Sequence, residues 1–142
     1  MTLNIDDLLN AFVILWAAID PIGTVPVFIA VTKGFKQDER KKIATFASIV
    51  AFLILLFFFI FGDVLLKRVG VPLSAFQISG GIILFLVALN MILGDSKPEE
   101  EIQLLKSGQD TAIFPLAIPS IAGPGAILAM VLLANRSHDS IK

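Results

Sequence analysis

Two apolar stretches of this 142-residue chain carry the residue types best suited to bind a small polar ligand. The first is residues 20–26 (DPIGTVP), and the second is residues 119–125 (PSIAGPG). Each combines an oxygen-bearing side chain with proline and glycine, which interrupt helices. In a membrane, an interrupted helix survives only where its free backbone groups are buried in protein or line a cavity. We therefore expect the two breaks to mark a binding site near the middle of the membrane.

The residue types at the first break predict a half-helix that begins inside the membrane. Aspartate is a strong N-cap, and proline is favoured at the first helical position, so Asp20 and Pro21 predict a cap and a helix start. The unpaired N–H groups of such a start attract a carboxylate. Asp20 has the opposite charge, which suits a ligand ammonium, a proton or a sodium ion, and capping alone is the alternative role. A small zwitterion would match both charges.

The second break has similar residues. Ser120 can cap locally, and Gly123 and Gly125 permit unusual backbone dihedrals or the close approach of a ligand. The candidate substrate-binding residues are Asp20, Gly23, Thr24, Ser120, Gly123 and Gly125. The prolines expected to break helices are Pro21, Pro26, Pro119 and Pro124.

The composition indicates a membrane protein. Hydrophobic residues make up 56% of the chain, charged residues only 16%, and the mean hydropathy is +0.89. A soluble fold of this size could not bury that much apolar surface. The net charge of −1 gives no sign of the basic patch that nucleic-acid binding requires. With no cysteine and a single histidine, His138 in a polar tail, we expect no metal site and no cofactor.

Hydropathy predicts an all-α bundle of transmembrane helices. The four expected spans cover about residues 8–31, 43–66, 73–93 and 111–134, with a linker at 95–110. Loops 32–42 and 94–110 carry seven basic residues against four on the other side, which predicts that these loops are cytoplasmic and the N-terminus outside. Asp63, with Lys67 one turn later, is expected at the outer end of the second span.

The spacing of the two breaks suggests an internal repeat. Three spans precede the linker, so the fourth must enter the membrane from the opposite side. If it repeats the first span, residues 1–94 are one three-helix repeat and residues 111–142 begin a second, inverted one. Aligning Gly23 with Gly123 places a break followed by an apolar half-helix in each.

Several motifs resemble those of the MarC family of bacterial and archaeal inner-membrane proteins. They are Asp20-Pro21 with Pro26, the pair Gly80-Gly81, and Pro115-x-x-x-Pro119 leading into residues 122–125 (AGPG). Some members of that family are described as transporters of small neutral amino acids. The resemblance implies six spans in two inverted halves, so a four-span chain would be a fragment or would lack two spans.

The expected function is secondary transport of small neutral amino acids by alternating access around the paired breaks, with H⁺ or Na⁺ as the possible coupling ion. The alternative is a non-transporting membrane subunit, or a truncated product, with a structural or assembly role. An enzyme is disfavoured, because a single intramembrane aspartate supplies too few side chains for catalysis. The expected partners are membrane lipid and the small amino acid, with a second copy of the chain as a further candidate.

Overall fold

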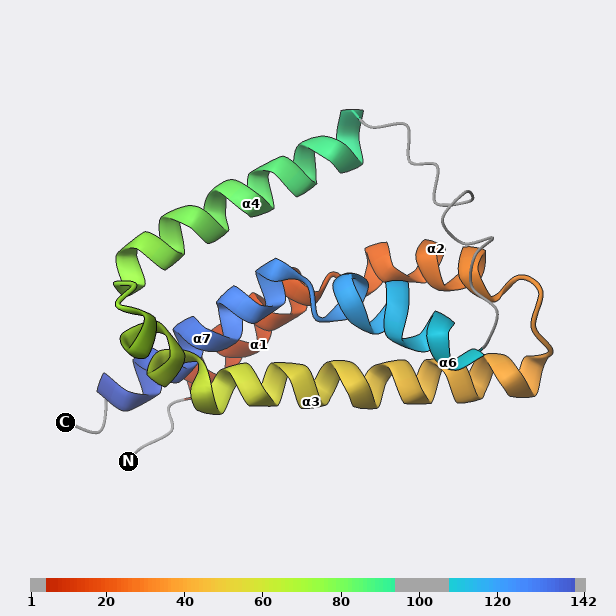
Figure 1. Ribbon diagram of the computed structural model, residues 1–142, viewed down its shortest axis with the longest axis horizontal. Coiled ribbons are helices and arrows are strands. Elements are labelled where there is room, and N and C mark those ends of the chain that lie inside the picture. Colours follow the sequence, from red (N-terminus) through yellow and green to blue (C-terminus); the bar gives the residue numbers. More distant parts are fainter. Residues whose placement is uncertain (1–4, 94–107, 140–142) are drawn as a thin grey trace.

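The computed structural model describes residues 5–93 and 108–139, and every regular element within them is helical (Figure 1). The elements are α1 (Ile5–Ile19), α2 (Pro21–Thr32), α3 (Gln37–Val69), α4 (Leu73–Leu93), α6 (Gly108–Thr111), the π-type helix η1 (Ala112–Ile121) and α7 (Pro124–Asp139). The all-α prediction is therefore confirmed. The expected linker 95–110 lies mostly outside the described residues.

Within residues 5–93 and 108–139, two helical stretches are long and apolar enough to cross a membrane. They are Ile5–Thr32, with 28 residues, and Gln37–Val69, with 33 residues. Gly108–Ile121 and Pro124–Asn135 would form a third span if this pair, bent by 59°, counts as one. In α4 the apolar run Leu73–Leu86 is shorter, so a fourth span and the inverted repeat stay predictions.

The two broken helices run in opposite directions along α3 (Figure 1). The stretch α1–α2 is antiparallel to α3, whereas α6, η1 and α7 run parallel to it. The connection between α2 and α3 lies at the same end of the molecule as α6. The start of α1 and the end of α7 lie at the other end. This arrangement brings the middles of the two broken helices to the same level of the molecule.

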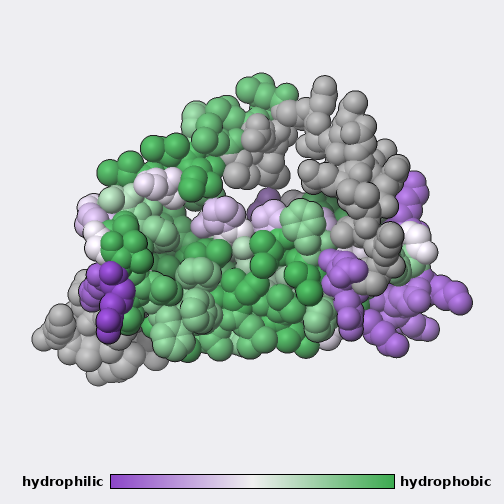
Figure 2. All heavy atoms as spheres, in the orientation of Figure 1, coloured by the Kyte–Doolittle hydropathy of each residue, from purple (hydrophilic) through white to green (hydrophobic). Residues whose placement is uncertain are grey.

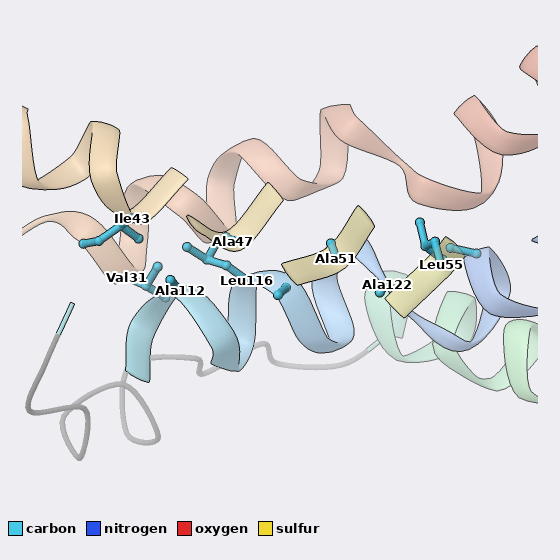
Figure 3. Packing of buried hydrophobic residues seen from close by; sticks show 10 residues of the cluster. Val31, Ile43, Ala47, Ala51, Leu55, Ala112, Leu116 and Ala122 are labelled. Atoms are coloured by element: carbon cyan, nitrogen blue, oxygen red, sulfur yellow. The ribbon is translucent and has the colours of Figure 1, made fainter. Parts of the chain in front are cut away.

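Small residues on one face of α3 let the broken helices approach it closely. Ala47 and Ala51 are buried there between Ile43 and Leu55, at a spacing of four residues. Figure 3 shows this row facing side chains of α2, η1 and the second break: Val31, Ala112, Leu116 and Ala122. Such small-residue faces are typical of packed membrane helices. The opposite faces of α3 expose large apolar side chains, as expected for a lipid-facing surface.

A polar link joins the C-terminal part of α3 to α7. Asp63 pairs with Lys67 at 2.6 Å and also accepts a hydrogen bond from Asn135 Nδ2 at 3.0 Å. One residue earlier, Gly62 is buried, and a Cβ there would lie 2.5 Å from Val131 Cγ2. Because the Lys67 side chain is 74% exposed, the ion pair itself adds little stability. The hydrogen bond and the glycine contact fix α7 against α3.

Arg40 holds the C-terminus of α2. Its Nε donates to the carbonyl oxygens of Thr32 at 2.9 Å and Phe35 at 3.1 Å, and its Nη2 donates to that of Lys33 at 3.0 Å. The last carbonyls of a helix have no partner within the helix, so a side-chain donor must satisfy them. Arg40 thereby fixes the turn between α2 and α3.

Replacing Arg40 with alanine should lower the free energy of unfolding by about 1–3 kcal/mol, because charge-assisted hydrogen bonds are lost. Arg40→Lys should recover only part of this, since one ammonium group lacks the planar fork of guanidinium. Denaturation of the detergent-purified protein measures both, with Lys33→Ala, an exposed neighbour, as the control. Equal stability of the Arg40→Ala and Lys33→Ala variants would refute the capping role.

Candidate functional site

The first break is a single residue between two helices. Asp20 separates α1 from α2 and has a left-handed backbone with φ 46° and ψ 65°, a region that aspartate tolerates better than most residues. Its Oδ1 accepts a hydrogen bond of 3.0 Å from the N–H of Gly23. Pro21 is the first residue of α2. The N-cap and helix start predicted for Asp20 and Pro21 are therefore confirmed.

Pro26 does not break the first helix, contrary to expectation. It lies inside α2, which continues to Thr32. A proline within a helix removes one N–H, here the partner of the Ile22 carbonyl four residues earlier. Membrane helices tolerate this when the freed carbonyl finds another partner or the helix adjusts locally. The single break in Ile5–Thr32 is thus at Asp20.

The second break begins earlier in the chain than the expected residues 119–125. η1 ends at Ile121, and α7 begins at Pro124. Extended backbone already occurs within η1 at Phe114 and Ile118. These two residues precede Pro115 and Pro119, and proline disfavours helical backbone in the residue before it. That rule, applied along residues 112–121, would have located both irregular positions.

Glycines at the breaks serve close packing. The sequence suggested unusual backbone dihedrals at Gly123 and Gly125, but neither has a positive φ. Within the described ranges, the glycine with a positive φ is Gly70. A Cβ on Gly123 would lie 2.6 Å from the carbonyl oxygen of Pro119, and one on Gly23 would collide with the Asp20 carboxylate. These glycines leave room for neighbouring protein groups.

The two breaks meet through a pair of hydroxyl groups. Ser120 Oγ donates to Thr24 Oγ1 at 3.3 Å, across 96 residues of sequence. Thr24 Oγ1 also lies 3.1 Å from the carbonyl oxygen of Asp20 and 3.5 Å from that of Ser120. With one proton, the Thr24 hydroxyl donates to one of these carbonyls at a time. Ser120, expected to cap its own helix, instead bonds across to the other broken helix.

We term the region where the two breaks meet, around Thr24 and Ser120, the crossing. In it, the start of each half-helix lies beside the end of the other broken helix. Thr24 in the first turn of α2 contacts Ser120 near the end of η1. A Cβ on Gly125, the second residue of α7, would lie 3.7 Å from the carbonyl oxygen of Ala18 near the end of α1. The sequence led us to expect two helix starts facing one ligand. The structure adds two helix ends, so N–H donors and C=O acceptors meet in one region.

The crossing has one packed side and one accessible side. Gly125 and Ala126 are buried, and a Cβ on Gly125 would lie 2.5 Å from Leu84 Cδ2 of α4. Gly80 of α4 likewise approaches Leu128 of α7. The side chain of Asp20 is exposed, so the described residues do not enclose it as expected. The contribution of Leu84 was not anticipated, because an apolar residue in an apolar helix gives no distinguishing signal.

The chain matches a known protein family along nearly its whole length. The family model described as "MarC family integral membrane protein" matches residues 5–142. This chain belongs to the MarC family. It is thus an integral membrane protein, in agreement with its apolar helices.

The curated relatives of this chain are named as membrane proteins. A "UPF0056 membrane protein" of Aquifex aeolicus is 41% identical over 128 residues, covering 87% of this chain and 60% of the relative. One from Archaeoglobus fulgidus is 38% identical, covering 92% and 63%. "UPF0056 membrane protein YvbG" of Bacillus subtilis is 36% identical, covering 94% and 65%. The chain thus spans less than two thirds of the length of these relatives. No solved structure matches it.

Proposed function

We propose that this MarC protein takes part in secondary transport of small neutral amino acids, with the crossing of the two broken helices as the substrate site. The hydrogen bond between Thr24 and Ser120 carries the proposal, because it joins the breaks of two antiparallel membrane helices. Discontinuous helices that meet inside a bundle are the usual setting for transporter sites. Alternating access would follow from one broken helix rocking against the other around this contact.

The chemistry of the crossing favours a small zwitterion. The exposed Asp20 carboxylate suits an ammonium group, and the N–H groups that open α7 suit a carboxylate. Asp20 is already partly engaged, since Oδ1 caps Gly23. A very small side chain is proposed because the backbone of the crossing is rich in glycine, at Gly23, Gly123 and Gly125. Glycine, alanine and serine are therefore the proposed substrates, with H⁺ or Na⁺ as the coupling ion.

Uptake by the purified protein in liposomes tests this proposal. Radiolabelled glycine, alanine and serine are offered under an imposed proton gradient, a sodium gradient or neither, with glutamate and phenylalanine as control solutes. We expect gradient-dependent accumulation of the small neutral amino acids above that in empty liposomes. Correctly inserted protein with no uptake under any gradient would refute transport and favour the structural or assembly role.

A further inference from the structure

A pocket of about 720 Å³ lies between the N-terminal half of α3 and the short helix α6, away from the crossing. Its size is within the range of small-molecule sites, about 300–1,000 Å³. Lys41 and Lys42 line it on α3, and Gly108 lines it on α6. Its apolar lining includes Phe46 and Ile49, which are 39% and 52% exposed. The pocket therefore joins positive charge to an apolar wall.

The two lysines keep their charge available. Within residues 5–93 and 108–139 neither forms an ion pair. Glu39 also lines the pocket, but its Oε2 accepts a hydrogen bond of 2.9 Å from the N–H of Lys36 at the start of α3. There the positive end of the helix dipole partly offsets its charge. Arg40 is directed to the end of α2. The charge left at the pocket suits an anion.

Charge and apolar surface are separated along the axis of α3. Lys42, Phe46 and Ile49 are spaced by four and three residues, so they share one face of the helix. Seven residues of helix correspond to about 10 Å, which places the lysine nearer the end of the helix and Ile49 deeper along it. Figure 2 shows hydrophilic residues gathered at this end of the molecule beside the apolar surface. A phospholipid is arranged in the same way, because its charged phosphate lies at the membrane surface and its apolar acyl chains lie deeper.

We propose that this pocket binds an anionic phospholipid, with its phosphate at Lys41 and Lys42 and the upper part of an acyl chain against Phe46 and Ile49. Basic pockets between helices at a membrane surface are typical sites for anionic lipid headgroups. The site is separate from the proposed transport site and does not depend on it. Its occupant is the lipid of the surrounding bilayer.

Native mass spectrometry of the detergent-purified protein tests the proposal, using phosphatidylglycerol and phosphatidylcholine with identical chains. We expect phosphatidylglycerol to be retained preferentially. The double variant Lys41→Gln/Lys42→Gln should bind it roughly 25-fold more weakly, at about fivefold per lysine. Lys33→Gln/Lys36→Gln removes the same charge from the turn just before α3, outside the pocket lining, and should leave retention unchanged.

The apolar half of the site is tested separately. Ile49→Trp fills the wall without changing charge and should weaken retention, whereas Leu53→Trp, exposed one turn further along α3, should not. Equal retention of phosphatidylcholine, or equal losses in the two lysine pairs, would overturn the proposal. So would displacement by inorganic phosphate at concentrations similar to those of the lipid, which would indicate a site for free phosphate. Failure to retain any lipid would also overturn it.

Discussion

Asp20→Asn is expected to reduce uptake of small neutral amino acids by about tenfold or more, while the protein still inserts and folds. Asparagine caps helices as well as aspartate does and tolerates the left-handed backbone of this position. Its side-chain oxygen can accept the hydrogen bond from Gly23 that the carboxylate accepts now. The substitution therefore removes the negative charge and keeps the cap. A hydrogen bond to a charged group typically contributes about 1.5–3 kcal/mol, so its loss weakens binding by about tenfold or more.

Two further variants separate charge from capping. Asp6→Asn removes an exposed carboxylate from the first turn of α1 and should leave uptake unchanged. Asp20→Ala removes both the charge and the cap, so it should also lower the free energy of unfolding by about 0.5–2 kcal/mol. Uptake and denaturation are measured on the same preparations. Normal uptake by Asp20→Asn would show that the carboxylate acts only as a helix cap.

Gly123→Ala should destabilise the second break by about 1–3 kcal/mol, and Gly123→Leu by more. The new Cβ would lie 2.6 Å from the carbonyl oxygen of Pro119. Because that atom belongs to the backbone, it cannot move aside as the end of a flexible side chain can. The residues around Ser120 would have to shift, and the contact with Thr24 would weaken. We expect loss of uptake together with earlier thermal unfolding.

Gly81→Ala is the matched control for Gly123. It lies in α4, and a Cβ there would meet no atom within 4 Å. Alanine favours helix over glycine by up to about 1 kcal/mol, so this variant should be as stable as the native protein or more so. If Gly123→Ala were as stable as Gly81→Ala and transported normally, the tight packing assigned to the second break would be wrong.

The first break was predictable because its signal is local. Asp20 and Pro21 specify a cap and a helix start by their own chemistry, independent of the rest of the fold. Pro26 has the same local preference, but five residues of α2 precede it and the helix continues through it. Proline identity alone therefore does not distinguish a helix start from a tolerated interior position.

The partners at the crossing were not predictable from local chemistry. Ser120 was expected to cap its own helix, yet its hydroxyl bonds to Thr24, 96 residues away. The α3 face with Ala47 and Ala51 also has no signal, because α3 is apolar on nearly all sides and its periodicity is weak. Which face of such a helix is buried depends on the shapes of its neighbours.

Cross-linking of residues 24 and 120 tests most directly the central claim, that the two breaks meet within the membrane. The chain has no native cysteine, so Thr24→Cys/Ser120→Cys introduces a single pair. The native hydroxyl oxygens are 3.3 Å apart, and a disulfide needs Cα atoms about 4.4–6.8 Å apart. On mild oxidation in membranes we expect this pair to form a disulfide, detected by mass and by loss of thiol labelling. The control pair Thr24→Cys/Val69→Cys, with the second thiol at the far end of α3, should stay reduced. Two thiols at positions 24 and 120 that both remain open to labelling after oxidation would contradict the account.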